Sequence, residues 1–98
     1  MELIVDRRVE NYIDNLTDLE QGRVLGYMEL FRKHKFSLPS KYLKKLDRNL
    51  WELRPGNLRL LIGKSGARVV VANIFKKKSQ KTPKSEIKTA KNRIKEYK

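Results

Sequence analysis

Two arginines on neighbouring predicted strands have the chemistry to bind a phosphate group between them. Strand alternation sends Trp51 and Leu53 to one face, which we expect to pack against helices, and Glu52 and Arg54 to the opposite, open face. Arg59 follows across a short turn, so its guanidinium can approach that of Arg54. Two guanidinium groups held close together are costly unless an anion lies between them, and arginine suits bidentate phosphate binding. In the alternative interpretation, Glu52 neutralises one arginine and the trio is a structural surface network.

A run of lysines leaves the last predicted strand and enters a helix N-terminus. The free amides and dipole of such a terminus favour phosphate, although many lysine runs are merely solvated. Phe75, just before the run, is available to stack on a base, but packing in the core is the favoured interpretation. The lysines that we expect near a phosphate are Lys76, Lys77, Lys78, Lys81 and Lys84.

Several kinds of catalytic centre are excluded by composition. The chain has no cysteine and one histidine, so thiolate nucleophiles, cysteine-ligated metals and Ser-His-Asp sites are ruled out. The only acidic residues after position 40 are Asp47, Glu52, Glu86 and Glu96, and Glu52 alone shares the predicted arginine face. We therefore expect neither a metal ion nor another cofactor.

The charge of the chain points to a polyanionic partner. The net charge is +13, but residues 1–40 hold six basic and seven acidic side chains, whereas residues 41–98 hold eighteen basic and four acidic. A domain tolerates such self-repulsion most readily when a polyanion sits against it, so nucleic acid is the leading candidate. A lysine-rich solubilising surface, or a face that pairs with an acidic protein, is the alternative. With neither a membrane-spanning run nor a signal-peptide pattern, we expect one cytoplasmic domain over residues 1–98.

The first half of the chain predicts a short strand and a helical hairpin. Residues 1–5 fit a strand that starts the sheet. The spacing of Val9, Tyr12, Ile13 and Leu16 predicts an amphipathic helix. Thr17 to Glu20 then reads as a capping box for a second helix, which ends near Lys33 and His34.

The second half predicts an antiparallel sheet followed by a helix. Ser40 is expected to cap one short helix, with Tyr42, Leu43 and Leu46 inward. Strands are predicted at 50–54, 58–62 and 68–75, separated by the turns 55–57 and 64–66. Thr82 as N-cap and Pro83 at the next position open the last helix. The fold class is therefore α+β.

Taken together, these motifs resemble the RelE/HigB toxins of type II toxin–antitoxin modules, in particular their phage-associated RelE-like branch. The resemblance rests on Leu-Trp-Glu-Leu-Arg at 50–54, the arginine of the next strand, and Lys-Lys-x-x-Lys-Thr-Pro at 77–83. It implies a RelE-like, microbial-ribonuclease-like fold and a ribosome-dependent endoribonuclease, an mRNA interferase, that inhibits translation. It also implies an antitoxin partner, which we expect to be a small helix-turn-helix protein encoded beside it.

The same resemblance assigns roles to single residues. Arg54 and Arg59 would stabilise the pentavalent phosphate of metal-independent cleavage by the 2′-OH. Lys77 or Glu52 would be the base, and Lys77 is favoured because repulsion from neighbouring lysines favours its neutral amine. Lys81 is the candidate acid, and the alternative role of Glu52 is to position Arg54. One departure is Asn73, where many relatives have histidine. Asparagine cannot exchange a proton at neutral pH, so help from the ribosome becomes more necessary.

Two other function classes stay open. The first is a toxin on the same RelE/ParE scaffold that poisons a protein target such as gyrase without catalysis. The second is a plain nucleic-acid-binding module, for which the basic second half suffices. Paired arginines favour a nuclease over the plain module, and the 77–83 motif favours it over the gyrase poison.

Overall fold

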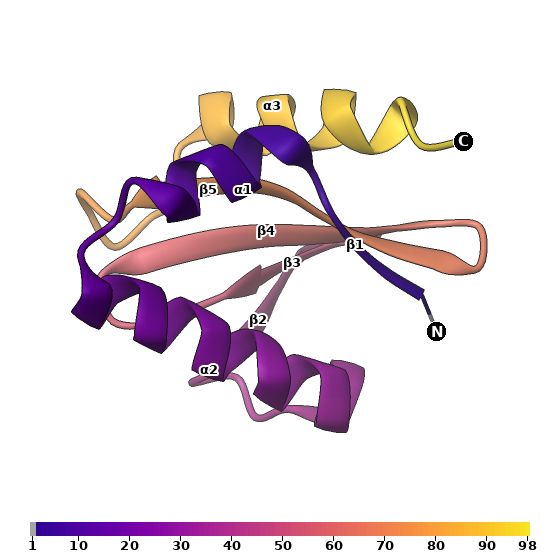
Figure 1. Ribbon diagram of the computed structural model, residues 1–98. Coiled ribbons are helices and arrows are strands. Elements are labelled where there is room, and N and C mark those ends of the chain that lie inside the picture. The colour runs from indigo at the N-terminus through magenta and orange to yellow at the C-terminus, as the bar shows by residue number, and fades with distance from the viewer. Residues whose placement is uncertain (1) are drawn as a thin grey trace.

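The computed structural model describes residues 2–98 and has an α+β architecture (Figure 1). The elements, in chain order, are β1 (Glu2–Val5), α1 (Arg7–Asp14), α2 (Asp18–His34), the short 3-10 turn η1 (Lys35–Ser37), β2 (Leu43–Asp47), β3 (Leu50–Leu53), β4 (Leu58–Ser65), β5 (Arg68–Lys76) and α3 (Lys84–Lys95). The strand predicted at 1–5 is confirmed for Glu2–Val5, and Met1 lies outside the described residues. Within residues 2–98, no helix has the length and apolar character needed to cross a membrane.

The helical hairpin forms where the local sequence signals place it. The Thr17 hydroxyl accepts from the Glu20 amide at 3.2 Å, and the Glu20 carboxylate accepts from the Thr17 amide at 3.1 Å, which confirms the capping box. Val9 and Ile13 are buried on the inner face of α1. His34 is the last residue of α2, as predicted.

The sheet has five strands in the order β1-β5-β4-β3-β2. β1 runs parallel to β5, and the other neighbours are antiparallel, so the sheet is mixed rather than purely antiparallel. The predicted turn at 55–57 is confirmed, and Gly56 there has a φ of 60° that favours glycine. β4 continues to Ser65, so the second turn is one residue tighter than predicted and has Gly66 in the left-handed region.

The short helix expected after Ser40 is wrong, because that segment forms the edge strand β2. Leu43 pairs with Leu53 and Lys45 with Trp51. Leu43 is buried, whereas Lys44 and Lys45 lie exposed on the outer edge of the sheet. Pairing with β3 therefore decides the structure of this segment, despite a spacing of apolar residues and an N-cap residue that suit a helix. These two local signals contain no information about a strand partner.

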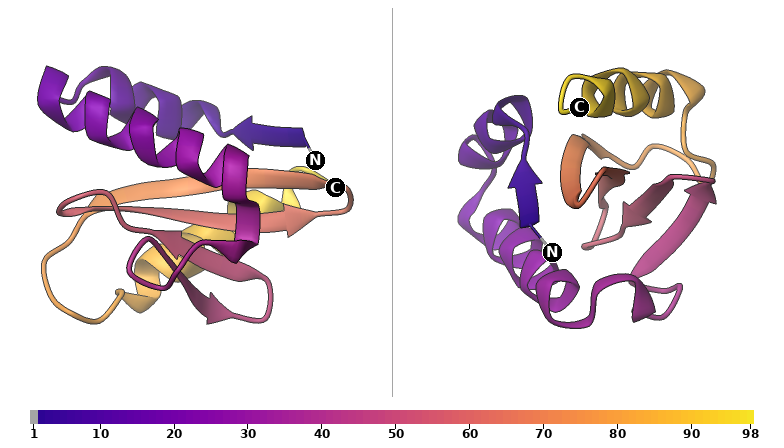
Figure 2. Two further views of the ribbon diagram at one scale, coloured as in Figure 1. Left: turned by 90° about the horizontal axis from the view of Figure 1, so that it is seen from below. Right: turned by 90° about the vertical axis from the view of Figure 1, so that its right-hand side faces the viewer.

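The two faces of the sheet are covered by different helices, as the right-hand view of Figure 2 shows. α1 and α2 pack on one face, where Leu53, Leu60 and Val71 join the larger apolar cluster. α3 packs on the other face, where Ala90 and Ile94 meet a second cluster of strand residues. The described apolar residues of that second cluster are Leu50, Leu61, Val70, Ala72 and Phe75.

Close approach of α3 to the sheet depends on Gly63. A Cβ at this position would overlap the Cδ1 atom of Ile94 and lie 2.9 Å from the backbone oxygen of Asn49. These two contacts leave no space for a side chain, so glycine is required here. Backbone conformation is not the reason, since the φ of Gly63 lies outside the left-handed region.

A buried carboxylate ties the two ends of the chain together. Asp6 caps α1 and is 1% exposed. It accepts hydrogen bonds from the Arg8 amide at 2.8 Å and from the Tyr97 hydroxyl at 2.8 Å. The Arg8 hydrogen bonds, reinforced by that from Tyr97, hold the pKa of Asp6 well below its usual range.

Replacing this carboxylate should reduce stability in a pH-dependent way. Because the folded pKa is lowered, Asp6 stabilises the fold above the pKa of an unfolded aspartate, about 3.9, and this contribution declines as the pH falls from there toward the folded pKa. We expect Asp6→Asn to lower the free energy of unfolding by about 1–3 kcal/mol at pH 7, with a smaller difference from the wild type at pH 3. Urea denaturation at pH 7 and at pH 3 measures the difference in the free energy of unfolding between the variant and the wild type.

The control is Asp14→Asn, which changes an exposed carboxyl at the end of α1 and should have little effect at either pH. A difference between Asp6→Asn and the wild type that is equally large at pH 3 and pH 7 contradicts the role given to the charge of Asp6.

Candidate functional site

The predicted arginine face is covered rather than open, and this part of the prediction is wrong. Alternation along β3 does put Glu52 opposite Leu53, but α3 and the segment 77–83 lie over that face. Glu52 is 3% exposed and Arg59 7% exposed. The apolar residues Leu61 and Val70 on the same face need a cover, and α3 provides it.

A buried carboxylate lies between the two arginines at the ends of β3 and β4. The Oε1 atom of Glu52 is 3.6 Å from Nε of Arg54 and 3.9 Å from Nε of Arg59. Arg59 also donates through Nη1 to the backbone oxygens of Leu58 at 2.7 Å and Gly56 at 2.9 Å. Burial, followed by the nearby charge of Arg54, lowers the pKa of Arg59. The two sequence interpretations thus coexist, since the arginines converge and Glu52 partly neutralises them.

Arg54 retains capacity to bind a further group. Its side chain is 27% exposed, and its buried Nε atom has no hydrogen-bond partner among residues 2–98. A buried unpaired donor carries a desolvation cost that an anion would remove. Of the two arginines, Arg54 is therefore the one with a vacant donor, whereas Arg59 is held by backbone carbonyls.

The segment 77–83 closes a small hollow over these charges. The hollow is lined by Glu52, Arg59, Phe75, Lys77, Lys78, Lys81 and Thr82, among others, and its volume is about 10 Å³. That is room for about one water molecule. The Lys77 amide donates to the Asn57 oxygen at 2.7 Å, which fixes the start of the segment beside the 55–57 turn. A phosphate group can enter only after the segment moves.

The predicted lysines fall into two groups. Lys77, Lys78 and Lys81 line the hollow, whereas Lys76 and Lys84 do not. Lys76 lies 3.6 Å from a Glu20 carboxylate oxygen, and Lys84 is exposed at the first position of α3. The charge run is therefore split between the hollow and the surface beside it.

Two local predictions around this segment need correction or refinement. Thr82 is not the N-cap of α3; Pro83 is, and it provides no capping side chain. The Thr82 hydroxyl instead donates to Oε2 of Glu52 at 2.5 Å, a charge-assisted bond that outcompetes capping. Phe75 is 8% exposed and packs in the α3-side cluster, so its ring serves the core.

The second half of the chain thus combines paired strand arginines, a buried glutamate and a lysine-rich closing segment on a mixed sheet. A family model described as phage derived protein Gp49-like (DUF891) matches residues 11–95. The chain belongs to this Gp49-like family. The family is part of the RelE/toxin-like superfamily, which agrees with the coarser resemblance noted above; membership of the RelE/HigB toxins themselves stays a prediction. No curated protein matches the chain.

In this Gp49-like chain, Asn73 has a structural role. Its side-chain nitrogen donates to the backbone oxygen of Glu86 at 3.1 Å and to the Glu86 carboxylate at 2.9 Å. Arg93 donates to the backbone oxygen of Ala72 at 3.1 Å, one residue away along β5. The residue at the position where histidine was anticipated therefore anchors α3 to β5.

Two residues of the site were missed at the sequence level. Thr82 was assigned to capping, and Arg23 was not considered. Arg23 projects from α2 toward the 55–57 turn, where its Nη1 atom would lie 3.3 Å from a Cβ on Gly56. No local signal marks either residue, because Thr82 and Glu52 are thirty positions apart and Arg23 sits on an ordinary exposed helix face.

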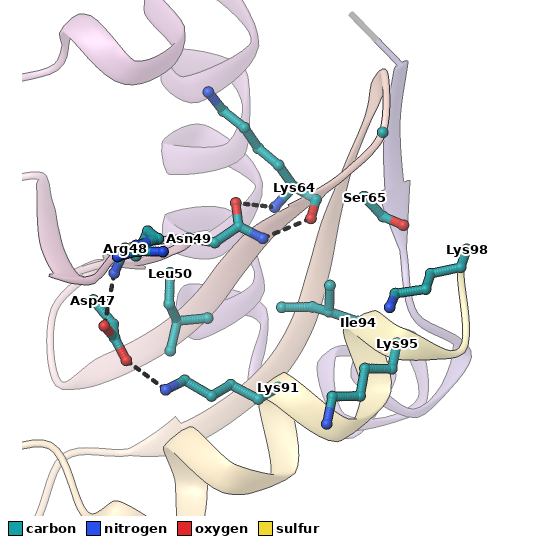
Figure 3. Close-up of a pocket in the computed structure, with 11 residues that line it drawn as sticks. Asp47, Arg48, Asn49, Leu50, Lys64, Ser65, Lys91, Ile94, Lys95 and Lys98 are labelled. Carbon is teal, nitrogen blue, oxygen red and sulfur yellow. Dashed lines mark hydrogen bonds and ion pairs between the residues drawn. The ribbon is translucent and has the colours of Figure 1, made fainter.

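A larger cavity of about 470 Å³ lies at the other end of the same face (Figure 3). Leu50 and Ile94 line it, and Lys91 pairs with Asp47 at its rim. The Lys64 side chain points away from the cavity, and its ammonium lies 4.6 Å from the Phe36 ring centre. No pair of arginines converges on this cavity among the described residues, which distinguishes it from the arginine end of the sheet.

Removing the buried charge of Glu52 tests the electrostatics of the hollow. We expect Glu52→Gln to lower the free energy of unfolding by about 2–4 kcal/mol, because Arg54 and Arg59 then repel without a counter-charge. Phosphate should restore part of this loss, since the anion replaces the carboxylate, and sodium chloride at equal ionic strength should restore less. Thermal and urea unfolding in the two salts measure both effects.

The matched control is Glu96→Gln, because Glu96 pairs with Arg8 on an exposed surface. It should change stability little and should gain from phosphate, relative to chloride, only the general stabilisation that the wild type gains. A gain of Glu52→Gln from phosphate that is no larger than that of Glu96→Gln would show that the arginine pair has no anion site.

Proposed function

We propose that this Gp49-like protein is the toxin of a type II toxin–antitoxin module and that it cuts mRNA on the ribosome without a metal ion. The observation that carries the proposal is the convergence of Arg54 and Arg59 on Glu52, with a vacant donor on Arg54, under a lysine-rich segment. Membership of a RelE/toxin-like superfamily supports the same assignment. Because the proposed substrate is mRNA on the ribosome, the proposed activity takes place in the cytoplasm.

In the proposed reaction, the RNA supplies its own nucleophile. The 2′-OH attacks the adjacent phosphorus and loses its proton, the bond from phosphorus to the 5′-oxygen breaks, and that oxygen is protonated as it leaves. Arg54 binds the phosphate oxygens through its vacant donor, and Arg59 stabilises the growing negative charge. The products are a 2′,3′-cyclic phosphate, or the 3′-phosphate derived from it, and a free 5′-OH.

The proton-transfer roles fall to the lysines of the hollow. Both carboxylate oxygens of Glu52 are already engaged, Oε1 by the two guanidinium groups and Oε2 by the Thr82 hydroxyl. We therefore assign Glu52 to positioning Arg54 and Arg59, Lys77 to accepting the 2′-OH proton, and Lys81 to protonating the 5′-oxygen. Acidic and histidine side chains of residues 2–98 form no group of three that could hold a metal ion.

Opening of the segment 77–83 is a necessary step of the proposal. A hollow of about 10 Å³ cannot hold a phosphate group, and the Thr82–Glu52 hydrogen bond closes it. RNA binding must break this bond and displace the segment. In this proposal, contacts with the ribosome supply the free energy that holds the segment 77–83 in the open position.

Arg54→Ala is the sharpest test of the activity. Inducible expression of the wild type should arrest growth and produce new mRNA ends with 5′-OH groups, and Arg54→Ala should reduce cleavage by at least about 100-fold while leaving the fold intact. A substrate with 2′-deoxyribose at the cut position should resist. Arg59→Ala is less suitable, because Arg59 is buried and holds two backbone carbonyls, so its loss should destabilise the fold.

Lys88→Ala provides the control, since Lys88 is exposed on α3 and does not line the hollow. It should cut like the wild type. New ends bearing 5′-phosphate would overturn the mechanism, and growth arrest without new mRNA ends would favour a toxin that binds a protein target.

The antitoxin is proposed to cover the basic half of the chain with an acidic segment. Steering between opposite charges is screened by salt, so the association rate should fall by about tenfold or more between low and high ionic strength. Stopped-flow mixing with the product of the neighbouring gene measures this rate. A rate that does not change with salt would show that the acidic segment does not guide binding.

A further inference from the structure

A second groove adjoins the arginine hollow and is built from three different elements. It lies between α1, the end of β5 and the first turn of α3, and its volume is about 500 Å³. It shares Phe75, Lys78 and Pro83 with the hollow, so the two adjoin on either side of these residues. An RNA strand with one phosphate at the arginine end can therefore place a neighbouring nucleotide in the groove.

The groove combines two aromatic residues, the half-buried Tyr12 and the buried Phe75, with two lysines. Tyr12 of α1 is half-buried and packs against the larger apolar cluster, which holds its ring in place. Lys76 and Lys78 are exposed on the opposite wall. The acidic groups nearby already have partners, because Glu86 accepts from Asn73 and Glu20 pairs with Lys76. Lys78 is therefore the lysine of this groove for which no acidic partner is described.

A fixed aromatic ring beside lysines is the arrangement that binds single-stranded nucleic acid. Bases stack on aromatic rings regardless of sequence, while cations follow the backbone. A volume of about 500 Å³ falls within the range of small-molecule pockets. The cavity of Figure 3 has a similar volume but no aromatic ring in its lining, so the same chemistry does not apply there.

We propose that this groove binds the nucleotide next to the cleaved phosphate, with its base stacked on Tyr12 and its own phosphate held by Lys78. The inference rests on the proposed function for the identity of the RNA, and it adds a base-contacting residue that the cleavage scheme does not use. Tyr12 is thus a binding residue, whereas Arg54 acts on the reacting phosphate.

The binding experiment uses an RNA that cannot be cut. The probe is a seven-nucleotide 2′-O-methyl uridine strand with 2-aminopurine at its centre, whose fluorescence is quenched by stacking. The wild type and Tyr12→Phe should quench it, whereas Tyr12→Leu should lose the quenching and bind roughly 5- to 100-fold more weakly. Leucine keeps the apolar packing of Tyr12, so the variant retains its fold, which thermal unfolding verifies.

Trp51→Leu is the matched control. Trp51 is also a half-buried aromatic residue with lysines nearby, Lys45 and Lys64, but it lies on the α2 side of the sheet. Its replacement should leave probe binding unchanged. An equal loss with Trp51→Leu and Tyr12→Leu would mean that aromatic residues bind the strand without a defined groove, and would overturn the proposal.

Arg54→Ala separates the groove from the cleavage chemistry. This variant should lose mRNA cleavage yet still quench 2-aminopurine, while Tyr12→Leu should lose the quenching and still leave 5′-OH groups at the sites that it cuts. If the wild type cuts mRNA but Tyr12→Leu binds and quenches normally, the groove is wrong and the proposed function stands. If quenching depends on Tyr12 but the wild type does not cut mRNA, the groove binds RNA and the proposed function is wrong. If the wild type does not quench the probe, the proposed groove is wrong.

Discussion

The arrangement of this protein depends on the burial of β4 and β5 on both faces. Their apolar residues alternate between two clusters, so a single layer of helices cannot cover them. The helical hairpin covers one face, and α3 must cover the other. Because α3 follows β5 directly, the connection 77–83 has to cross the end of the sheet, where β3 ends and β4 begins. The lysine-rich segment lies over Glu52 and Arg59 as a consequence of how the second face is covered.

Burial of that end makes Glu52 the electrostatic centre of the site. Two guanidinium groups under a covering segment would repel each other strongly in a medium of low dielectric constant. Glu52 offsets this repulsion, and Thr82 satisfies its second oxygen. The two arginines are therefore partly neutralised from within, and Arg54 keeps one buried unpaired donor. In the proposed function, a phosphate would compete with Glu52 for the arginines, which couples RNA binding to release of the closing segment.

Features that depend on neighbouring residues were predictable from sequence, and those that depend on distant partners were not. The capping box at Thr17, the 55–57 turn and the helix stripe of Val9 and Ile13 are local, and all three are confirmed. β2 was mistaken for a helix because its strand partner lies several residues further along the chain. For the site, sequence brought Glu52, Arg54 and Arg59 together correctly but left them open to solvent. The apolar runs of β4 and β5 were the signal that the second face is buried.

The presence of asparagine at position 73 can be understood from the way α3 is attached. An imidazole at this position would have to serve both proton transfer and the attachment of α3, and Asn73 serves the attachment through two bonds to Glu86. Chemistry that lacks this imidazole must then depend on charge and on position rather than on a group that titrates near pH 7. Positive charge is already concentrated at the arginine end, whereas correct placement of the RNA phosphate would require the segment 77–83 to open. In the proposed function, access to the hollow would therefore limit cleavage, and a large RNA assembly that holds the segment open would supply the condition that the isolated protein lacks.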